Sequence, residues 1–105
     1  MKIKTIDVNA LEWFDKINGN SYFAGTVTVN YGTKTEKSFN MPYQYGYGDM
    51  YKQIAMETLV NESVIKVEKY PYGGYPPLWQ YCSDNGIILR TVKHENCKKR
   101  ELLNI

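Results

Sequence analysis

Residues 17–31 read INGNSYFAGTVTVNY, and this stretch decides which fold the chain can adopt. Asn18-Gly19 is the strongest short signal for a β-hairpin, because both residue types tolerate positive φ. Beyond the turn, two sets of side chains alternate: Phe23, Gly25, Val27, Val29 and Tyr31 against Tyr22, Ala24, Thr26, Thr28 and Asn30. The first set predicts a face turned to a core, and the half-polar second set predicts a face turned to solvent.

Further strands are predicted on both sides of this hairpin. Polar and apolar side chains alternate in residues 2–8, as they would in a short strand. Residues 10–17 contribute apolar side chains to the core but show no clear helical or strand spacing. Residues 35–41 predict a third strand, which Pro42 should end because proline has no N–H to give to a sheet. The result is an antiparallel β-meander of three or more strands.

The clearest helical spacing comes after the glycine–tyrosine loop at residues 43–48. Apolar or small side chains recur there at i, i+3, i+4, i+7 and i+8, namely Tyr51, Ile54, Ala55, Thr58 and Leu59. This spacing predicts a helix over residues 50–61 whose apolar stripe packs on the sheet, with Asp49 as its N-cap.

The remainder of the chain predicts a short α-β extension. Residues 63–70 read as an extended segment, and the proline- and glycine-rich residues 71–77 as a loop. Short elements follow: a helix at 78–85, a strand at 87–92 and one or two helical turns at 96–103. We therefore predict a single α+β domain, residues 1–105, with one main helix packed on an antiparallel sheet.

The composition limits the classes of protein to which this chain can belong. Its 105 residues are 43% hydrophobic, which is enough for one core and too much for a disordered chain. No apolar run approaches the roughly 20 residues that cross a bilayer, and the N-terminus lacks the apolar region of a secretory signal. We expect a cytoplasmic protein that does not associate with a membrane.

Residues suited to catalysis or metal binding are few. His94 is the one histidine, and it stands in a charged stretch beside Glu95. Cys82 and Cys97 match no zinc spacing with it, and no third group is apparent to orient a Cys–His pair. We expect two free thiols, no metal, no cofactor and no enzymatic activity.

Tyrosine is the unusual feature of the composition, with ten copies, most of them between Tyr43 and Tyr81. Tyrosine favours recognition surfaces because it offers a large rigid contact area with a polar tip, although some of the ten should simply pack beside glycine turns. The two tyrosine–glycine loops are the candidate partner-binding surface, through Tyr43, Tyr45, Tyr47, Tyr72 and Tyr75.

The second candidate is the basic C-terminal segment. Residues 86–105 carry five basic side chains against two acidic ones, and the candidates among them are Lys93, Lys98, Lys99 and Arg100. Such a segment can contact nucleic acid or an acidic protein face. The net charge is only +2, which is low for a protein that binds nucleic acid. A nucleic-acid-binding regulator is therefore the alternative, and a protein binder is the main prediction.

Three separated motifs resemble a family of small proteins of about 100 residues that bacteriophages and other mobile elements encode. They are Trp13-Phe14-Asp15-Lys16-Ile17-Asn18-Gly19-Asn20-Ser21-Tyr22-Phe23, Tyr43-Gln44-Tyr45-Gly46-Tyr47-Gly48 and Asn96-Cys97-Lys98-Lys99-Arg100-Glu101-Leu102. The resemblance implies no catalytic residues. It implies an accessory protein that binds a host protein stoichiometrically in the host cytoplasm, such as an anti-CRISPR-like inhibitor of a defence nuclease.

Overall fold

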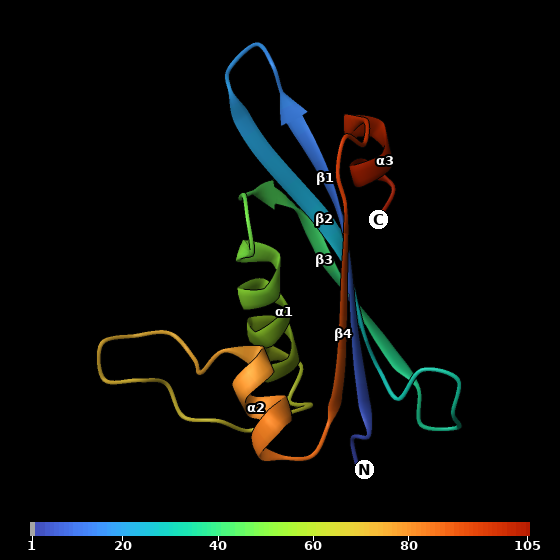
Figure 1. Ribbon diagram of the computed structural model, residues 1–105, viewed down its shortest axis with the longest axis vertical. Helices are drawn as coiled ribbons and strands as arrows, with labels where there is room; N and C mark the ends of the chain where they lie inside the picture. Colours follow the sequence, from blue (N-terminus) through green and yellow to red (C-terminus); the bar gives the residue numbers. More distant parts are fainter. Residues whose placement is uncertain (1) are drawn as a thin grey trace.

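The computed structural model describes residues 2–105, which form a four-stranded sheet and three helices (Figure 1). In chain order the elements are β1 (Thr5–Asp15), β2 (Asn20–Val29), β3 (Lys37–Tyr45), α1 (Met50–Asn61), α2 (Leu78–Asp84), β4 (Ile88–His94) and α3 (Lys99–Leu103). The strand order across the sheet is β3-β2-β1-β4. The predicted α+β class is confirmed.

The hairpin of β1 and β2 is the longest pairing in the sheet and continues to Asp15, through residues whose period was unclear from the sequence. Its turn has four residues, 16–19, and only Gly19 in it has positive φ. The Asp15 carboxylate accepts hydrogen bonds from the N–H groups of Ile17 and Asn18. The predicted hairpin is therefore confirmed, while its turn is longer than a two-residue Asn-Gly turn.

The prediction of a purely antiparallel sheet is wrong, because β4 pairs with β1 in parallel. The α-β extension does not stand beside the sheet but supplies its fourth strand. A parallel partner needs a crossover of a dozen or more residues, which β2, β3, α1 and α2 provide here. The segment at residues 63–70 forms no regular element and belongs to the loop that leads from α1 into α2.

Pro42 does not end the third strand, as the sequence predicted it would. Strand β3 continues to Tyr45, and the register against β2 shifts between Phe23 and Gly25, where Pro42 and Tyr43 lie opposite the single residue Ala24. A missing N–H is tolerated on an edge strand and at a bulge, and Pro42 lies at both.

The main core lies on the sheet face that α1 and α2 cover, to the left of the sheet in Figure 1. Its buried residues are Ile6, Val8, Ala10, Phe23, Val27, Val29, Met41, Tyr51, Ala55, Met56, Leu59, Ile65, Leu78 and Cys82. Helix α1 spans the predicted residues, but Asp49 makes no side-chain cap. Its carboxylate pairs with Lys52 instead, at 3.5 Å.

The opposite sheet face is only partly open to solvent, because α3 packs on it across β1, β2 and β3 (Figure 1). Leu102 of α3 is buried, and so are Ala24, Thr28 and Asn30, which the sequence assigned to a solvent face. Tyr31, assigned to the core face, is exposed because β2 ends at Val29.

Candidate binding surface

Five aromatic rings form a continuous series on the face that carries α3, and we call this series the aromatic ladder. It consists of Trp13, Tyr22, Tyr43, Tyr45 and Tyr47. The Tyr22 ring is central: its centroid lies 5.5 Å from that of Trp13 and 5.2 Å from that of Tyr43, and both pairs are stacked. Tyr45 meets Tyr22 edge-on at 5.8 Å, and Tyr47 meets Tyr45 edge-on at 6.2 Å.

Strand register explains how residues far apart in the chain form this ladder. Trp13 and Tyr22 are direct partners across the β1–β2 hairpin, and Tyr22 and Tyr45 are direct partners across β2 and β3. Direct partners on one face of a sheet lie close enough for ring contacts. Tyr43 precedes Tyr45 by two residues and so points to the same face, where it stacks on Tyr22.

Helix α3 closes one end of the ladder. The Lys99 ammonium lies 5.6 Å from the centroid of the Trp13 ring, within the range of a cation–π contact. The segment before α3 is tied to β1 by the Cys97 N–H, which donates to the Glu12 carbonyl at 2.9 Å. The Glu101 carboxylate caps the first turn of α3 by accepting from the Lys98 N–H at 2.9 Å. The basic segment is therefore joined to β1 and, through Trp13, to the ladder.

Exposure divides the ladder into a base and a free end. Trp13, Tyr22 and Tyr43 are half-buried, and loss of solvent raises the pKa of the Tyr43 hydroxyl. Tyr45 and Tyr47 are 52% and 65% exposed. The two rings available for contact therefore stand on a stacked base, which restricts their motion before any partner arrives.

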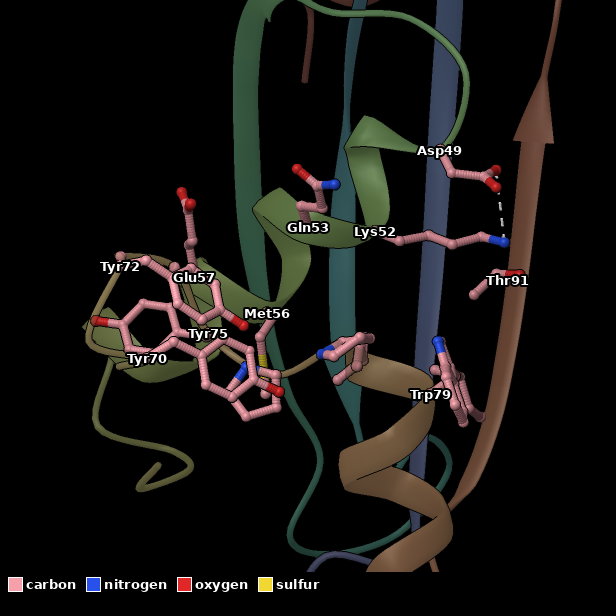
Figure 2. Close-up of a pocket in the computed structure, with 16 residues that line it drawn as sticks. Asp49, Lys52, Gln53, Met56, Glu57, Tyr70, Tyr72, Tyr75, Trp79 and Thr91 are labelled. Carbon is pink, nitrogen blue, oxygen red and sulfur yellow. Dashed lines mark ion pairs between the residues drawn. The ribbon is translucent and has the colours of Figure 1, made fainter. Parts of the chain in front are cut away.

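The second tyrosine loop lies elsewhere, on the side of α1 and α2. Tyr72 and Tyr75 line a cleft of about 610 Å³, the α1–α2 cleft, together with Tyr70, Trp79 and residues of α1 and β4 (Figure 2). Tyr72 is 83% exposed and stacks on Tyr70. The five predicted contact tyrosines thus belong to two surfaces, three to the aromatic ladder and two to this cleft.

Lys93 stands apart from the other predicted basic residues. Its ammonium lies 3.4 Å from the Glu12 carboxylate and 3.6 Å from that of Glu95, and it donates to the Gly48 carbonyl. Burial lowers the pKa of Lys93, but the two carboxylates outweigh this effect and raise it. Lys93 therefore ties β4 to β1 and to the start of α1, whereas Lys98, Lys99 and Arg100 lie together in or beside α3.

The two cysteine thiols lie in different surroundings. Cys82 is buried in the core, and burial raises the pKa of its thiol to about 11. The Cys97 thiol donates to the main-chain carbonyl of His94 at 3.2 Å.

Within residues 2–105 there is no group of three or more His, Cys, Asp or Glu side chains that could hold a metal ion. No helix in this range is long and apolar enough to span a bilayer.

Comparison with known proteins adds no relative: neither a protein-family model nor a curated protein nor a solved structure matches the chain.

Sequence reasoning missed Tyr22, the centre of the ladder, and Trp13, the ring beside α3. The turn signal could not have found them, because a two-residue Asn18-Gly19 turn would pair Tyr22 with Asp15, whereas the observed pairing of Asp15 with Asn20 sets Tyr22 opposite Trp13. The length of the turn therefore decides whether the two rings meet, since it sets the register of the hairpin.

Proposed function

We propose that the protein is a non-enzymatic binder that acts stoichiometrically on a host protein, through the exposed end of the aromatic ladder. The observation that supports this proposal is the pairing of two exposed rings, Tyr45 and Tyr47, with a stacked base beneath them. Interface hot spots are enriched in tyrosine and tryptophan, and they cost less entropy on binding when they are held in place beforehand.

The class of partner follows from the family resemblance. Small accessory proteins of mobile elements commonly work by occupying a host protein, so we propose an anti-defence role, with a host nuclease such as a CRISPR effector as the target. The site of action is then the host cytoplasm. The basic side chains of Lys98 and Arg100, beside the ladder, suit electrostatic steering toward an acidic face of the target.

The test replaces the exposed rings and leaves their base intact. We expect the Tyr45→Ala/Tyr47→Ala variant to fold normally and to lose at least about 2 kcal/mol of partner binding, as hot-spot residues do. The matched control is Tyr72→Ala/Tyr75→Ala in the α1–α2 cleft, which should still capture the partner. The measurement is a pull-down from nuclease-treated host lysate, with thermal unfolding of each variant recorded in parallel.

The control pair decides between two surfaces. Loss of capture by the cleft variant, with capture by the ladder variant unchanged, would move the binding surface to the opposite face and reject the ladder. Unfolding of both variants without selective loss of binding would mean that these tyrosines are structural. A catalytic turnover of any host component would reject the stoichiometric mechanism.

One observation favours nucleic acid as a second candidate. The Lys99 ammonium over the Trp13 ring, beside Lys98 and Arg100, combines a basic segment with aromatic faces, as single-strand-binding surfaces do. Binding of an oligonucleotide should then weaken steeply with added salt and should fall in a Lys98→Gln/Arg100→Gln variant. Fluorescence anisotropy at low and moderate salt measures both effects, and no binding at low salt removes this candidate.

A further inference from the structure

Strand β4 forms one edge of the sheet, and its outer side carries no other strand among residues 2–105 (Figure 1). Its main contacts are with β1 on the inner side and with α2 over one face. An uncovered edge presents a row of main-chain donors and acceptors that can pair with another strand.

The register shows which main-chain groups of β4 are free. The Ile88 N–H donates to the Lys4 carbonyl at 3.0 Å, so the main-chain groups of Ile88 point toward β1. Alternate residues of a strand point the same way, and Arg90 and Val92 therefore also bond to β1. The N–H and C=O groups of Leu89, Thr91 and Lys93 point outward, away from the sheet.

The devices that usually protect an edge are absent from the outer side of β4 and present on the opposite edge of the sheet. Strand β3 carries Pro42 and a bulge, both of which discourage pairing. On β4 the two cations are neutralised from within, since Arg90 pairs with Asp7 and Lys93 pairs with Glu12. Each of these two cations therefore repels an approaching strand less than an unpaired cation would.

Exposed apolar side chains flank this edge on both faces of the sheet. On the face of α3, Ile88 is 61% exposed and Val92 is 45% exposed. On the other face Trp79 of α2, itself largely exposed, and Thr91 line the α1–α2 cleft (Figure 2). Leu89 also lines this cleft. A partner strand on this edge would therefore bury apolar area above and below the sheet as well as forming main-chain hydrogen bonds.

We propose that the occupant of this edge is a second copy of the chain, with the two β4 strands antiparallel about a two-fold axis at Thr91. This register pairs the outward groups of Leu89 with those of the second copy's Lys93, and Thr91 with its own counterpart. It engages all three outward-pointing residues, whereas shifting the axis to Arg90 loses one pairing and places the two Arg90 side chains opposite each other. The edge is thus self-complementary, as a two-fold interface must be.

The interface does not depend on the proposed function, because the aromatic ladder contains no residue of β4 or α2. A strand edge with three apolar side chains per copy buries less than the roughly 1,200 Å² of a standard interface. We therefore expect a dimer with a dissociation constant in the micromolar range. Each α1–α2 cleft would gain a wall from the second copy, since Leu89 and Thr91 line it.

The first test is sedimentation equilibrium of the full chain over a wide concentration range. Val92→Lys places an ammonium opposite Arg90 of the second copy, twice in each dimer, and should weaken dimerisation at least about tenfold. Ile17→Lys is the matched control, because it also replaces a β-branched apolar side chain with lysine, at the exposed tip of the β1–β2 hairpin. A monomer at all concentrations, or a dimer that Val92→Lys leaves unchanged, overturns the proposal.

The second test fixes the register by cross-linking. In a Cys97→Ser background, Thr91→Cys brings two thiols together across the axis, where paired Cα atoms lie about 5.5 Å apart. Val92→Cys is the control, because its two copies lie more than about 7 Å apart in this register and cannot be bridged. Mild oxidation should yield a covalent dimer with Thr91→Cys only, and efficient bridging of Val92→Cys alone overturns the assigned axis.

Amide hydrogen exchange provides a third readout. The N–H groups of Leu89, Thr91 and Lys93 should exchange quickly in dilute protein and slowly in concentrated protein, while those of Arg90 and Val92 are protected in both. Exchange at the three outward amides that is independent of concentration contradicts a second copy. If those amides become protected only when another protein is added, the edge takes a foreign strand and the proposed occupant is wrong.

Discussion

Asp7 and Arg90 face each other across the parallel β1–β4 pair and form a two-point ion pair. Nε of Arg90 lies 2.7 Å from Oδ1 of Asp7, and Nη2 lies 2.9 Å from Oδ2. The hydrogen bond and the charge of this carboxylate raise the pKa of the guanidinium. Because Asp7 and Arg90 are direct register partners, the pair selects this alignment of β4 over a shift by one or two residues.

The Asp7–Arg90 pair should affect the alignment of β4 more than the stability of the domain. We expect Asp7→Asn to lower the melting temperature by only a few degrees, since the guanidinium is exposed and exposed ion pairs contribute little. Amide exchange at Arg90 and Val92 should accelerate, and NMR exchange measurements check this. Equal acceleration throughout β1 and β2 would instead mean that the pair supports the whole sheet.

Asn30 should be among the least replaceable polar residues of the chain. Its side chain accepts from the Lys4 N–H at 2.7 Å and donates to the Lys2 carbonyl and the Thr35 hydroxyl, and its φ is 54°. Asn30→Ala should cost about 2–4 kcal/mol of unfolding free energy, because it leaves three part-buried groups unpaired and places alanine in a backbone conformation that it disfavours.

Urea unfolding measures the cost of replacing Asn30, and Asn30→Asp separates the two roles of the amide. The carboxylate can still accept from Lys4 but cannot donate to Lys2, so its cost should be intermediate. A loss below about 0.5 kcal/mol for Asn30→Ala contradicts the anchoring role.

The ion pair of Glu12 and Lys93 should stabilise the fold in a pH-dependent way. The folded-state pKa of Lys93 is raised above the ordinary value of 10.5, so its contribution is fully present below that pH and is lost as the pH rises through the folded pKa. Glu12→Gln should cost about 1–3 kcal/mol near neutral pH, because both side chains are mostly buried.

The pH series compares wild type and Glu12→Gln by urea unfolding from pH 7 to pH 11. The difference between the two proteins should shrink at the alkaline end, and taking the difference removes the titration of tyrosines common to both. Glu95→Gln is the control with a smaller expected effect, since the Glu95 carboxylate is largely exposed. A difference that grows with pH would contradict the assigned pairing.

The two thiols should differ sharply in reactivity. Cys82 is buried with its pKa raised to about 11, so little thiolate forms at neutral pH and a reagent cannot reach it. With a disulfide reagent at pH 8, we expect native protein to release one equivalent quickly from Cys97 and the second only in denaturant. In Cys97→Ser the fast phase should vanish, and a persistent fast phase would show that Cys82 opens to solvent.

Local signals predicted most of the elements in this fold. The Asn18-Gly19 turn placed the hairpin, and the spacing in residues 50–61 placed α1 with the bounds that the structure has. The parallel pairing of β4 was not predictable in this way, because strand pairing over such a separation depends on the whole chain. Pro42 misled for a related reason: whether proline ends a strand depends on the strand's place in the sheet.

The candidate site was predictable in part. Tyrosine enrichment pointed to Tyr45 and Tyr47, which are exposed, and also to Tyr43, which the structure uses as a stacked base. The sequence could not separate the two tyrosine loops, since their positions on opposite sides of the sheet follow from the crossover. The sequence grouped Lys93 with the basic tail because of its charge alone. In the structure the alternation of side chains along β4 points Lys93 toward Glu12.

The crossover that makes β4 parallel to β1 also has a consequence for how the native state is reached. The β1–β2–β3 pairings join near neighbours in the chain, but Asp7 and Arg90 are 83 positions apart. Closing so large a loop costs entropy before its contacts compensate, so such pairings form late and slowly. We therefore expect a meander that assembles early, with β4 and then α3 docking last, and mutations on β4 should speed unfolding more than they slow refolding.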